Sequence, residues 1–148
     1  MTLSAEAICQ LADRAAIQDV LLRYARGVDR RDLDLVASCF TRDASYDGAL
    51  ARGTIGTALA RLRDNMARYD STMHCISNQF VEIAGDSASS ETYALAYHRL
   101  TDSGVAKLFT VGVRYLDELT REGDTWRICR RVVKREWQRT ETVDGHVA

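Results

Sequence analysis

The sequence predicts an α+β domain in which three N-terminal helices cover one side of a long, strongly curved, mostly antiparallel sheet. Up to about residue 70, apolar side chains recur every three to four residues, whereas beyond it they alternate at every second residue among many β-branched and aromatic side chains. The chain has 148 residues, of which 46% are hydrophobic and none is proline. This composition suits one compact domain, residues 1–148, built from long uninterrupted elements.

Three segments of the first half have helical periodicity. Residues 5–28 carry the apolar stripe of a long amphipathic helix. A shorter helix begins at the capping residue Asp32 and ends near Thr41. A third helix, residues 55–69, follows a glycine-threonine start signal, and a short strand is expected before it at residues 44–47.

The second half is expected to consist of four long strands joined by hairpins, because each strand is followed by a turn-forming cluster that contains glycine. Strands of more than ten residues are unusually long, so we expect the sheet to bend around the helices and to enclose an apolar, cone-shaped interior. Only the tail, residues 140–148, is expected to be loose. The predicted strands are residues 72–84, 88–101, 105–120 and 125–139.

The amino-acid composition restricts the classes of molecule that this protein is expected to bind. With 20 basic and 21 acidic side chains, the formal net charge of -1 argues against general attraction to nucleic acid or anionic membranes. The sequence has no long apolar run and no signal-peptide pattern, so we expect a cytoplasmic protein, outside membranes, whose partner is a small molecule. The scattered cysteines form no metal-binding or redox motif and are expected to be free thiols, namely Cys9, Cys39, Cys75 and Cys129.

Polar residues that face the predicted interior are the candidates for function, and Asp29 is the first of them. It follows the apolar stripe of the first helix by one residue. Asp29 either caps the second helix or pairs with Arg30 or Arg31, or it is free for a functional contact because Asp32 already fills the capping role.

His74 is the second candidate. Alternation at the start of the first long strand puts His74, Ile76, Asn78 and Phe80 on one face. That face carries the larger apolar groups, so we place it inward. An inward histidine is either a hydrogen-bonded core residue or a functional group.

A second histidine is expected close to His74. If the hairpin turn comprises residues 85–87, His98 lies directly opposite His74, whereas a two-residue turn puts Tyr97 opposite His74 and leaves His98 diagonal. Both registers place polar aromatic groups beside His74. Two buried imidazoles at one level of a cavity wall would both need partners, which favours a functional role over plain packing.

Two tyrosines and one arginine complete the candidates. Tyr24 on the first helix and Tyr46 in the short strand can reach the same cavity, although each hydroxyl is also compatible with plain packing. In the last strand, Arg135 shares a face with Trp126 only if a bulge near residues 129–131 reverses the alternation.

The third long strand is apolar on both faces, so both faces of the sheet are expected to be buried. Because the helices cover only one face, we expect a homodimer or homotrimer that associates through the sheet. The apolar residues of one parity are Val105, Phe109, Val111, Val113 and Tyr115, and those of the other include Leu108 and Leu116.

Nearly the whole chain also carries a series of motifs, namely LADRAAIQD at residues 11–19, Tyr24, GVDRRD at 27–32, FTRDA at 40–44 and GDTWRI at 123–128. In these motifs the sequence resembles the SnoaL-like branch of the nuclear transport factor 2-like superfamily. Within that branch it most resembles scytalone dehydratase, bile acid 7α-dehydratase and lindane dehydrochlorinase. These are cofactor-free eliminating enzymes with a cone-shaped α+β fold and a shared Asp-His dyad.

The resemblance implies that the dyad falls on Asp29 and His74. Further positions match functional tyrosine, arginine and histidine side chains of the dehydratases, namely Tyr24, Tyr46, His98 and Arg135. The superfamily also contains isomerases, polyketide cyclases and non-catalytic binding domains, so the fold alone does not specify a reaction.

The sequence therefore predicts a dehydratase-like lyase that removes water or another leaving group from a small, largely apolar or aromatic cyclic substrate without a cofactor or metal. His74 is expected to act as general base while Asp29 orients it, with Tyr24 and His98 as further catalytic groups. The alternatives are an isomerase or polyketide cyclase with the same base, or a non-catalytic small-molecule-binding domain. The expected substrate-binding residues are Tyr46, Asn78, Ile76, Phe80 and Arg135.

Overall fold

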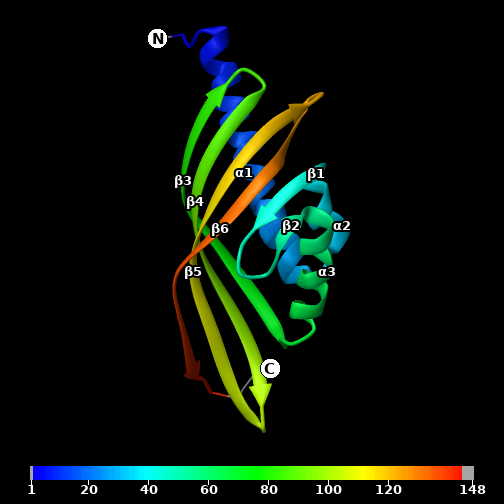
Figure 1. Ribbon diagram of the computed structural model, residues 1–148. Helices are drawn as coiled ribbons and strands as arrows, with labels where there is room; N and C mark the ends of the chain where they lie inside the picture. Colours follow the sequence, from blue (N-terminus) through cyan, green and yellow to red (C-terminus); the bar gives the residue numbers. More distant parts are fainter. Residues whose placement is uncertain (1, 145–148) are drawn as a thin grey trace.

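The computed structural model describes residues 2–144 and confirms the α+β class, with three helices and a six-stranded sheet. In chain order the elements are α1 (Ala5–Arg30), α2 (Leu33–Ser38), β1 (Phe40–Asp47), β2 (Arg52–Thr54), α3 (Ile55–Met66), β3 (Ser71–Ala84), β4 (Ser87–Asp102), β5 (Val105–Glu122) and β6 (Thr125–Thr142). The helices gather on one side of the long, bent strands, and the lower end of the β4–β5 hairpin extends past them (Figure 1).

The strand order in the sheet is β2-β1-β6-β5-β4-β3. The four long strands pair antiparallel in series, and β2 pairs antiparallel with β1, whereas β1 runs parallel to β6. The strand from the helical half of the chain therefore lies beside the last strand. This arrangement joins both halves of the sequence in one sheet around one interior.

The ends of several elements differ from the sequence-based expectation, most clearly those of α2 and β6. Helix α2 ends at Ser38 rather than near Thr41, because Phe40 and Thr41 already belong to β1, where Phe40 pairs with Ile128. The expectation of a loose tail from residue 140 is wrong for residues 140–142, because β6 continues to Thr142, which pairs with the start of β5. Residues 145–148 lie outside the described part of the chain.

The corner between α1 and α2 depends on a close approach at Gly27. Helix α1 ends as Arg31 enters the left-handed region with φ 58°, and the backbone N–H of Asp32 donates to the carbonyl of Gly27 at 2.8 Å. A Cβ at Gly27 would lie 2.8 Å from Val36 Cγ2, so a larger residue would push α2 away. The corner leaves Asp29 in the last turn of α1, next to the start of β3.

The pairing of β3 with β4 follows neither of the two registers considered above. The turn has two residues, because Ala84 pairs with Ser87, but the register shifts between Gln79 and Ile76. Two residues of β3, at 77 and 78, face one residue of β4 at this bulge. Beyond the bulge, His74 pairs with Ala96, and His98 lies opposite residue 72, diagonal to His74.

Because of the same bulge, two of the four residues predicted to face inward on β3 face outward. It reverses the alternation of β3, so His74 and Ile76 point inward whereas Asn78 and Phe80 point outward. Phe80 is 68% exposed. The expectation that Asn78 and Phe80 share the inward face of His74 is therefore wrong, and neither lies at the cavity described below.

A second bulge lies in β6, at the position near residues 129–131 where one was possible from the sequence. Glu118 pairs with Arg130 but Leu119 pairs with Ile128, so Cys129 is the extra residue. Trp126, Ile128 and Arg131 consequently all point toward the interior, where each is at most 1% exposed. The four cysteines are free thiols, as predicted.

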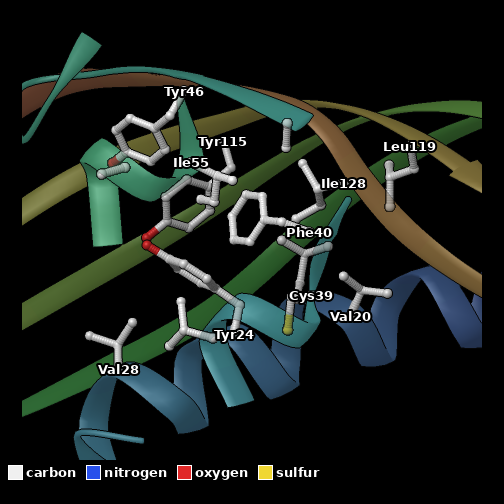
Figure 2. Close-up of a cluster of buried hydrophobic side chains, with 14 of the residues drawn as sticks. Val20, Tyr24, Val28, Cys39, Phe40, Tyr46, Ile55, Tyr115, Leu119 and Ile128 are labelled. Carbon is white, nitrogen blue, oxygen red and sulfur yellow. The ribbon is translucent and has the colours of Figure 1, made fainter. Parts of the chain in front are cut away.

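The core joins the inward face of α1 to the centre of the sheet. Ile17 and Leu21 of α1 are fully buried together with Leu119, Trp126 and Ile128 of β5 and β6. Figure 2 shows part of this cluster, with side chains of α1 facing those of β1 and β6. Burial of each such side chain contributes roughly 1.5–3 kcal/mol, so α1 is held firmly against the sheet. Among residues 2–144, no helix has the length and apolar character needed to span a bilayer.

Candidate active site

Asp29 and His74 lie in contact, one at the end of α1 and the other near the start of β3. The Asp29 Oδ1 atom lies 2.7 Å from His74 Nδ1 and accepts a hydrogen bond from the Thr72 hydroxyl at 2.9 Å. Asp29 Oδ2 accepts from the backbone N–H of His74 at 2.8 Å. Asp29 therefore caps no helix. Asp32 caps α2 instead, by accepting from the backbone N–H of Leu35 at 2.9 Å.

These contacts fix the charge of Asp29 and the tautomer of His74. Burial raises the pKa of Asp29, but hydrogen bonds from the His74 side chain and backbone and from Thr72 lower it, so the net pKa lies below its ordinary value. The ionised carboxylate can only accept, so His74 Nδ1 carries the proton of the neutral imidazole. The lone pair is then on Nε2, which makes no hydrogen bond with any residue in the described part of the chain.

Arg31 connects the helix that carries Asp29 to the loop before the strand that carries His74. It was not considered as a site residue from the sequence. Its side chain reaches from the end of α1 to the loop before β3, where Nη2 donates to the carbonyl of Tyr69 at 2.6 Å. The loop is fixed further because the backbone N–H of Asp70 donates to the carbonyl of Arg99 at 2.8 Å. A cation just beyond a helix C-terminus is electrostatically favourable, so Arg31 closes α1 and also positions the start of β3.

The pair opens onto a cavity of about 230 Å³ between α1, α3 and the concave face of the sheet. The His74 side chain is only 7% exposed, and its ring forms part of the cavity wall. An outer groove of about 510 Å³ beside Trp137 is larger, but its lining within residues 2–144 contains no histidine. Most of the wall around His74 is apolar and comprises Val28, Leu62, Met66, Ala96, Phe109, Val111, Val113 and Val133.

His98 lines the same cavity. Its ring centroid lies 5.8 Å from that of His74 with the planes at 80°, and 4.7 Å from the ring of Tyr69. His98 Nδ1 donates to the carbonyl of Phe109 at 3.2 Å, which leaves Nε2 of the neutral ring as an acceptor. Burial, and next the neighbouring His74, lower the pKa of His98, so this ring is neutral at pH 7.

Besides Tyr69, three tyrosines line the cavity, one each from α1, β1 and β5, and sequence reasoning named only Tyr24 and Tyr46. The third is Tyr115 of β5, which packs edge-on against Tyr24 with ring centroids 5.7 Å apart. Burial raises the pKa of all three phenols, so they stay protonated and can donate hydrogen bonds. Tyr115 shares a parity with Phe109, Val111 and Val113 in the sequence, which was the available signal for its inward position.

The remaining predicted residues divide between the cavity and its surroundings. Arg135 lines the cavity, and its side chain donates a hydrogen bond to Gln138. Ile76 packs against the core rather than the cavity wall. Within residues 2–144, no cluster of three or more His, Cys, Asp or Glu side chains is arranged to hold a metal ion.

The chain is similar to several known proteins over most of its length. An uncharacterized protein of Mycobacterium tuberculosis is 29% identical over 139 residues, which cover 89% of this chain and 91% of that protein. The crystal structure of a putative scytalone dehydratase from Novosphingobium aromaticivorans has a TM-score of 0.77 at 19% identity, covering 94% of this chain and 91% of that one.

A further crystal structure, of the hexachlorocyclohexane dehydrochlorinase LinA-type3 from Novosphingobium barchaimii, has a TM-score of 0.75 at 22% identity and covers 93% of this chain and 94% of that one. At these identities the two structures establish the shared cone-shaped α+β fold. A family model described as a SnoaL-like domain matches residues 10–132, which span α1 to the middle of β6. The chain therefore belongs to the SnoaL-like family.

Proposed function

We propose that this protein is a lyase that eliminates water or another leaving group from a small, largely apolar cyclic substrate, with His74 as the general base. The observation that carries the proposal is the two-sided placement of the His74 ring. Asp29 holds Nδ1 at 2.7 Å, and the ring with its free Nε2 forms part of the cavity wall. A buried ion pair of purely structural use would be closed off by side chains instead.

The proposed reaction begins when Nε2 of His74 takes a proton from a carbon next to a substrate carbonyl. Asp29 stabilises the imidazolium, and buried tyrosine hydroxyls of the cavity, Tyr24 among them, donate hydrogen bonds to the oxygen as enolate charge develops. The electron pair then expels the β-hydroxyl, which leaves as water when it takes the proton back from His74. His98 Nε2 can accept a hydrogen bond from the departing hydroxyl, and Arg135 can donate one at the cavity mouth.

The size of the cavity limits the substrate. An apolar cavity of about 150 Å³ accommodates benzene, so about 230 Å³ accommodates one substituted ring or two small fused rings. The structural relatives support elimination from rings, because the names scytalone dehydratase and hexachlorocyclohexane dehydrochlorinase both denote elimination reactions. An isomerase or cyclase could use the same base, since both start from the same enolate.

The test is a screen of hydroxylated cyclic ketones for loss of water, followed by mass spectrometry. His74→Ala should lower the elimination rate by about 10²–10⁴, the usual scale for a positioned base. Cys75→Ala is the matched control, because Cys75 is the next residue of β3 and is exposed on the other face. Deuterium uptake from heavy water without loss of water would favour the isomerase. Binding with neither reaction would favour the non-catalytic domain.

We also propose that the chain associates as a homodimer or homotrimer through the outer face of the sheet. That face exposes large apolar side chains, with Met73 62%, Tyr93 44% and Trp137 47% exposed. The Trp137 indole covers Gly112, where a Cβ would lie 2.4 Å from the ring. Exposed aromatic side chains around a groove are typical of association surfaces.

A further inference from the structure

Behind the tyrosine end of the cavity lies a fully buried ion pair. Arg131 of β6 and Asp117 of β5 sit directly opposite each other, and both side chains are 0% exposed. Nε and Nη2 of Arg131 donate to the two carboxylate oxygens of Asp117, each at 2.8 Å. Replacing such a pair with apolar residues of similar volume is often neutral or stabilising, so the pair is weak evidence for a role in stability.

The guanidinium is placed against the two tyrosines that line the cavity. Its Cζ lies 4.2 Å from the ring centroid of Tyr24 and 4.3 Å from that of Tyr115. The remaining nitrogen, Nη1, is buried and has no hydrogen-bond partner within residues 2–144. Figure 2 shows the hydroxyl ends of Tyr24 and Tyr115 pointing toward one another, away from their backbone attachments.

The two charges of this ion pair affect the pKa of Tyr24 unequally. After burial, the largest influence on the pKa of Tyr24 is Arg131, which lowers it, and the opposing effect of Asp117 is smaller. The phenols therefore stay protonated while a nearby cation strengthens them as hydrogen-bond donors. In a site with little water, such fixed donors favour a developing negative charge far more than they do in bulk water.

We infer that Tyr24 and Tyr115, backed by Arg131, form an oxyanion-binding pole opposite His74, so the substrate is an enolisable cyclic ketone whose oxygen lies between the two hydroxyls. The reaction assigned to such a substrate rests on the proposed function. The inference separates ketones from substrates without an oxygen, such as chlorinated hydrocarbons, which would leave the two donors unpaired. Arg131 is a positioning residue here, because it contacts the faces of both tyrosine rings and does not itself line the cavity.

The probe for this pole is 4-nitrophenol, a one-ring enolate analogue whose anion is coloured. The purified protein is titrated with it, and the pH at which the bound phenol ionises is followed by absorbance. The bound phenol should have an acid dissociation constant at least tenfold higher than the free phenol, which corresponds to 1.36 kcal/mol per pKa unit. Tyr115→Phe should remove most of this increase.

The role of Arg131 is tested with the double variant Asp117→Leu/Arg131→Met, because removing one partner alone leaves a buried charge unpaired. The double variant should fold, bind the neutral phenol and lose most of the increase in acidity. His74→Gln separates the two ends of the cavity and should keep the increase. Tyr93→Phe, which removes an outer-face hydroxyl, should behave as wild type.

Three results would overturn the inference. They are failure of the wild type to bind millimolar 4-nitrophenol, an unchanged increase in the folded double variant, and loss of the increase in His74→Gln. The last would place the anion at His74 rather than at the tyrosines. The elimination assay with His74→Ala tests the base independently, so the oxyanion pole and the proposed lyase activity can fail separately.

Discussion

Asp29→Asn is the sharpest test of the dyad, because the amide keeps the shape of the carboxylate but allows only two orientations. In one orientation the amide oxygen faces His74 Nδ1 and Thr72. The amide nitrogen then replaces Oδ2, which in the wild type accepts from the backbone N–H of His74 at 2.8 Å, so two donors face each other. If the amide is rotated, the backbone bond is kept and the amide N–H₂ donates to Nδ1. The second orientation is favoured because it avoids a buried donor pair.

The rotated amide reverses the tautomer of His74. Nδ1 becomes the acceptor, so the proton moves to Nε2, the nitrogen that has to accept the substrate proton. The variant also lacks the negative charge that stabilises the imidazolium. We therefore expect kcat to fall by about 10³–10⁴, or about 4–5.5 kcal/mol of barrier, with little change in KM. The cavity wall itself is unchanged, because Asp29 lies behind the His74 ring.

Nitrogen NMR of the imidazoles measures this change without any substrate. The sequence has three histidines, so His74→Gln, which removes only the His74 signals, provides the assignment. The wild type should show a protonated Nδ1 and an unprotonated Nε2 at pH 8, and Asp29→Asn should show the reverse. Asp32→Asn is the matched control, since Asp32 is a helix cap and its amide can still accept from Leu35. An unchanged His74 tautomer with full turnover in Asp29→Asn would refute this reasoning.

The other predictions concern stability and association. The folded-state pKa of Asp29 is lowered, so its contribution to stability is complete above the ordinary carboxyl pKa and disappears as the pH falls through the folded value. Urea unfolding should therefore show the stability gap to Asp29→Asn shrinking as the pH falls below about 4. Gly27→Ala should destabilise the fold by about 1–3 kcal/mol in thermal unfolding, because its Cβ would lie 2.8 Å from Val36 Cγ2, whereas the helical control Gly56→Ala should not. Light scattering should show a dimer or trimer that Trp137→Lys weakens, and a wild-type monomer at micromolar concentration would contradict association through the sheet.

Local sequence rules predicted the elements well where a local cause decides them. The change of period near residue 70 marks the start of the long strands, because β3 begins at Ser71. Asp32 caps α2 because its side chain reaches the Leu35 backbone within one turn. The sequence also predicted that Asp29 and His74 meet, and the structure places them in contact, although their catalytic role stays a prediction.

The misplaced residues depended on a bulge that no local signal marks. The bulge in β3 involves Ser77 and Asn78, neither of which is a glycine, and the Ser77 hydroxyl donates to the carbonyl of Tyr93 at 3.1 Å across the sheet. That partner lies 16 residues away along the sequence, so no local sequence pattern predicts the bulge. Asn78 and Phe80 were therefore assigned to the wrong face.

Arg131 was missed as a site residue for a related reason. Arginine is almost never fully buried without a partner, so a charged residue in an alternating strand is usually assigned to the surface. Its partner Asp117 lies on the neighbouring strand, 14 residues away. The pair can be recognised only when the register across the bulge at Cys129 is known.

The bulge at Cys129 decides which arginine enters the core and therefore which chemistry the cavity can support. If β6 continued the register of Ile128 opposite Leu119, Arg130 would lie opposite Asp117 and Lys134 would replace Arg135 near the cavity. With the bulge, Arg131 pairs with Asp117 beneath the tyrosines, while Arg130 pairs with the exposed Glu118 at 2.8 Å. One inserted residue thus sets the polar groups at the end of the cavity opposite His74. Because base and oxyanion donors must face one substrate from opposite sides, the geometry of this bulge matters as much for the proposed reaction as the dyad does.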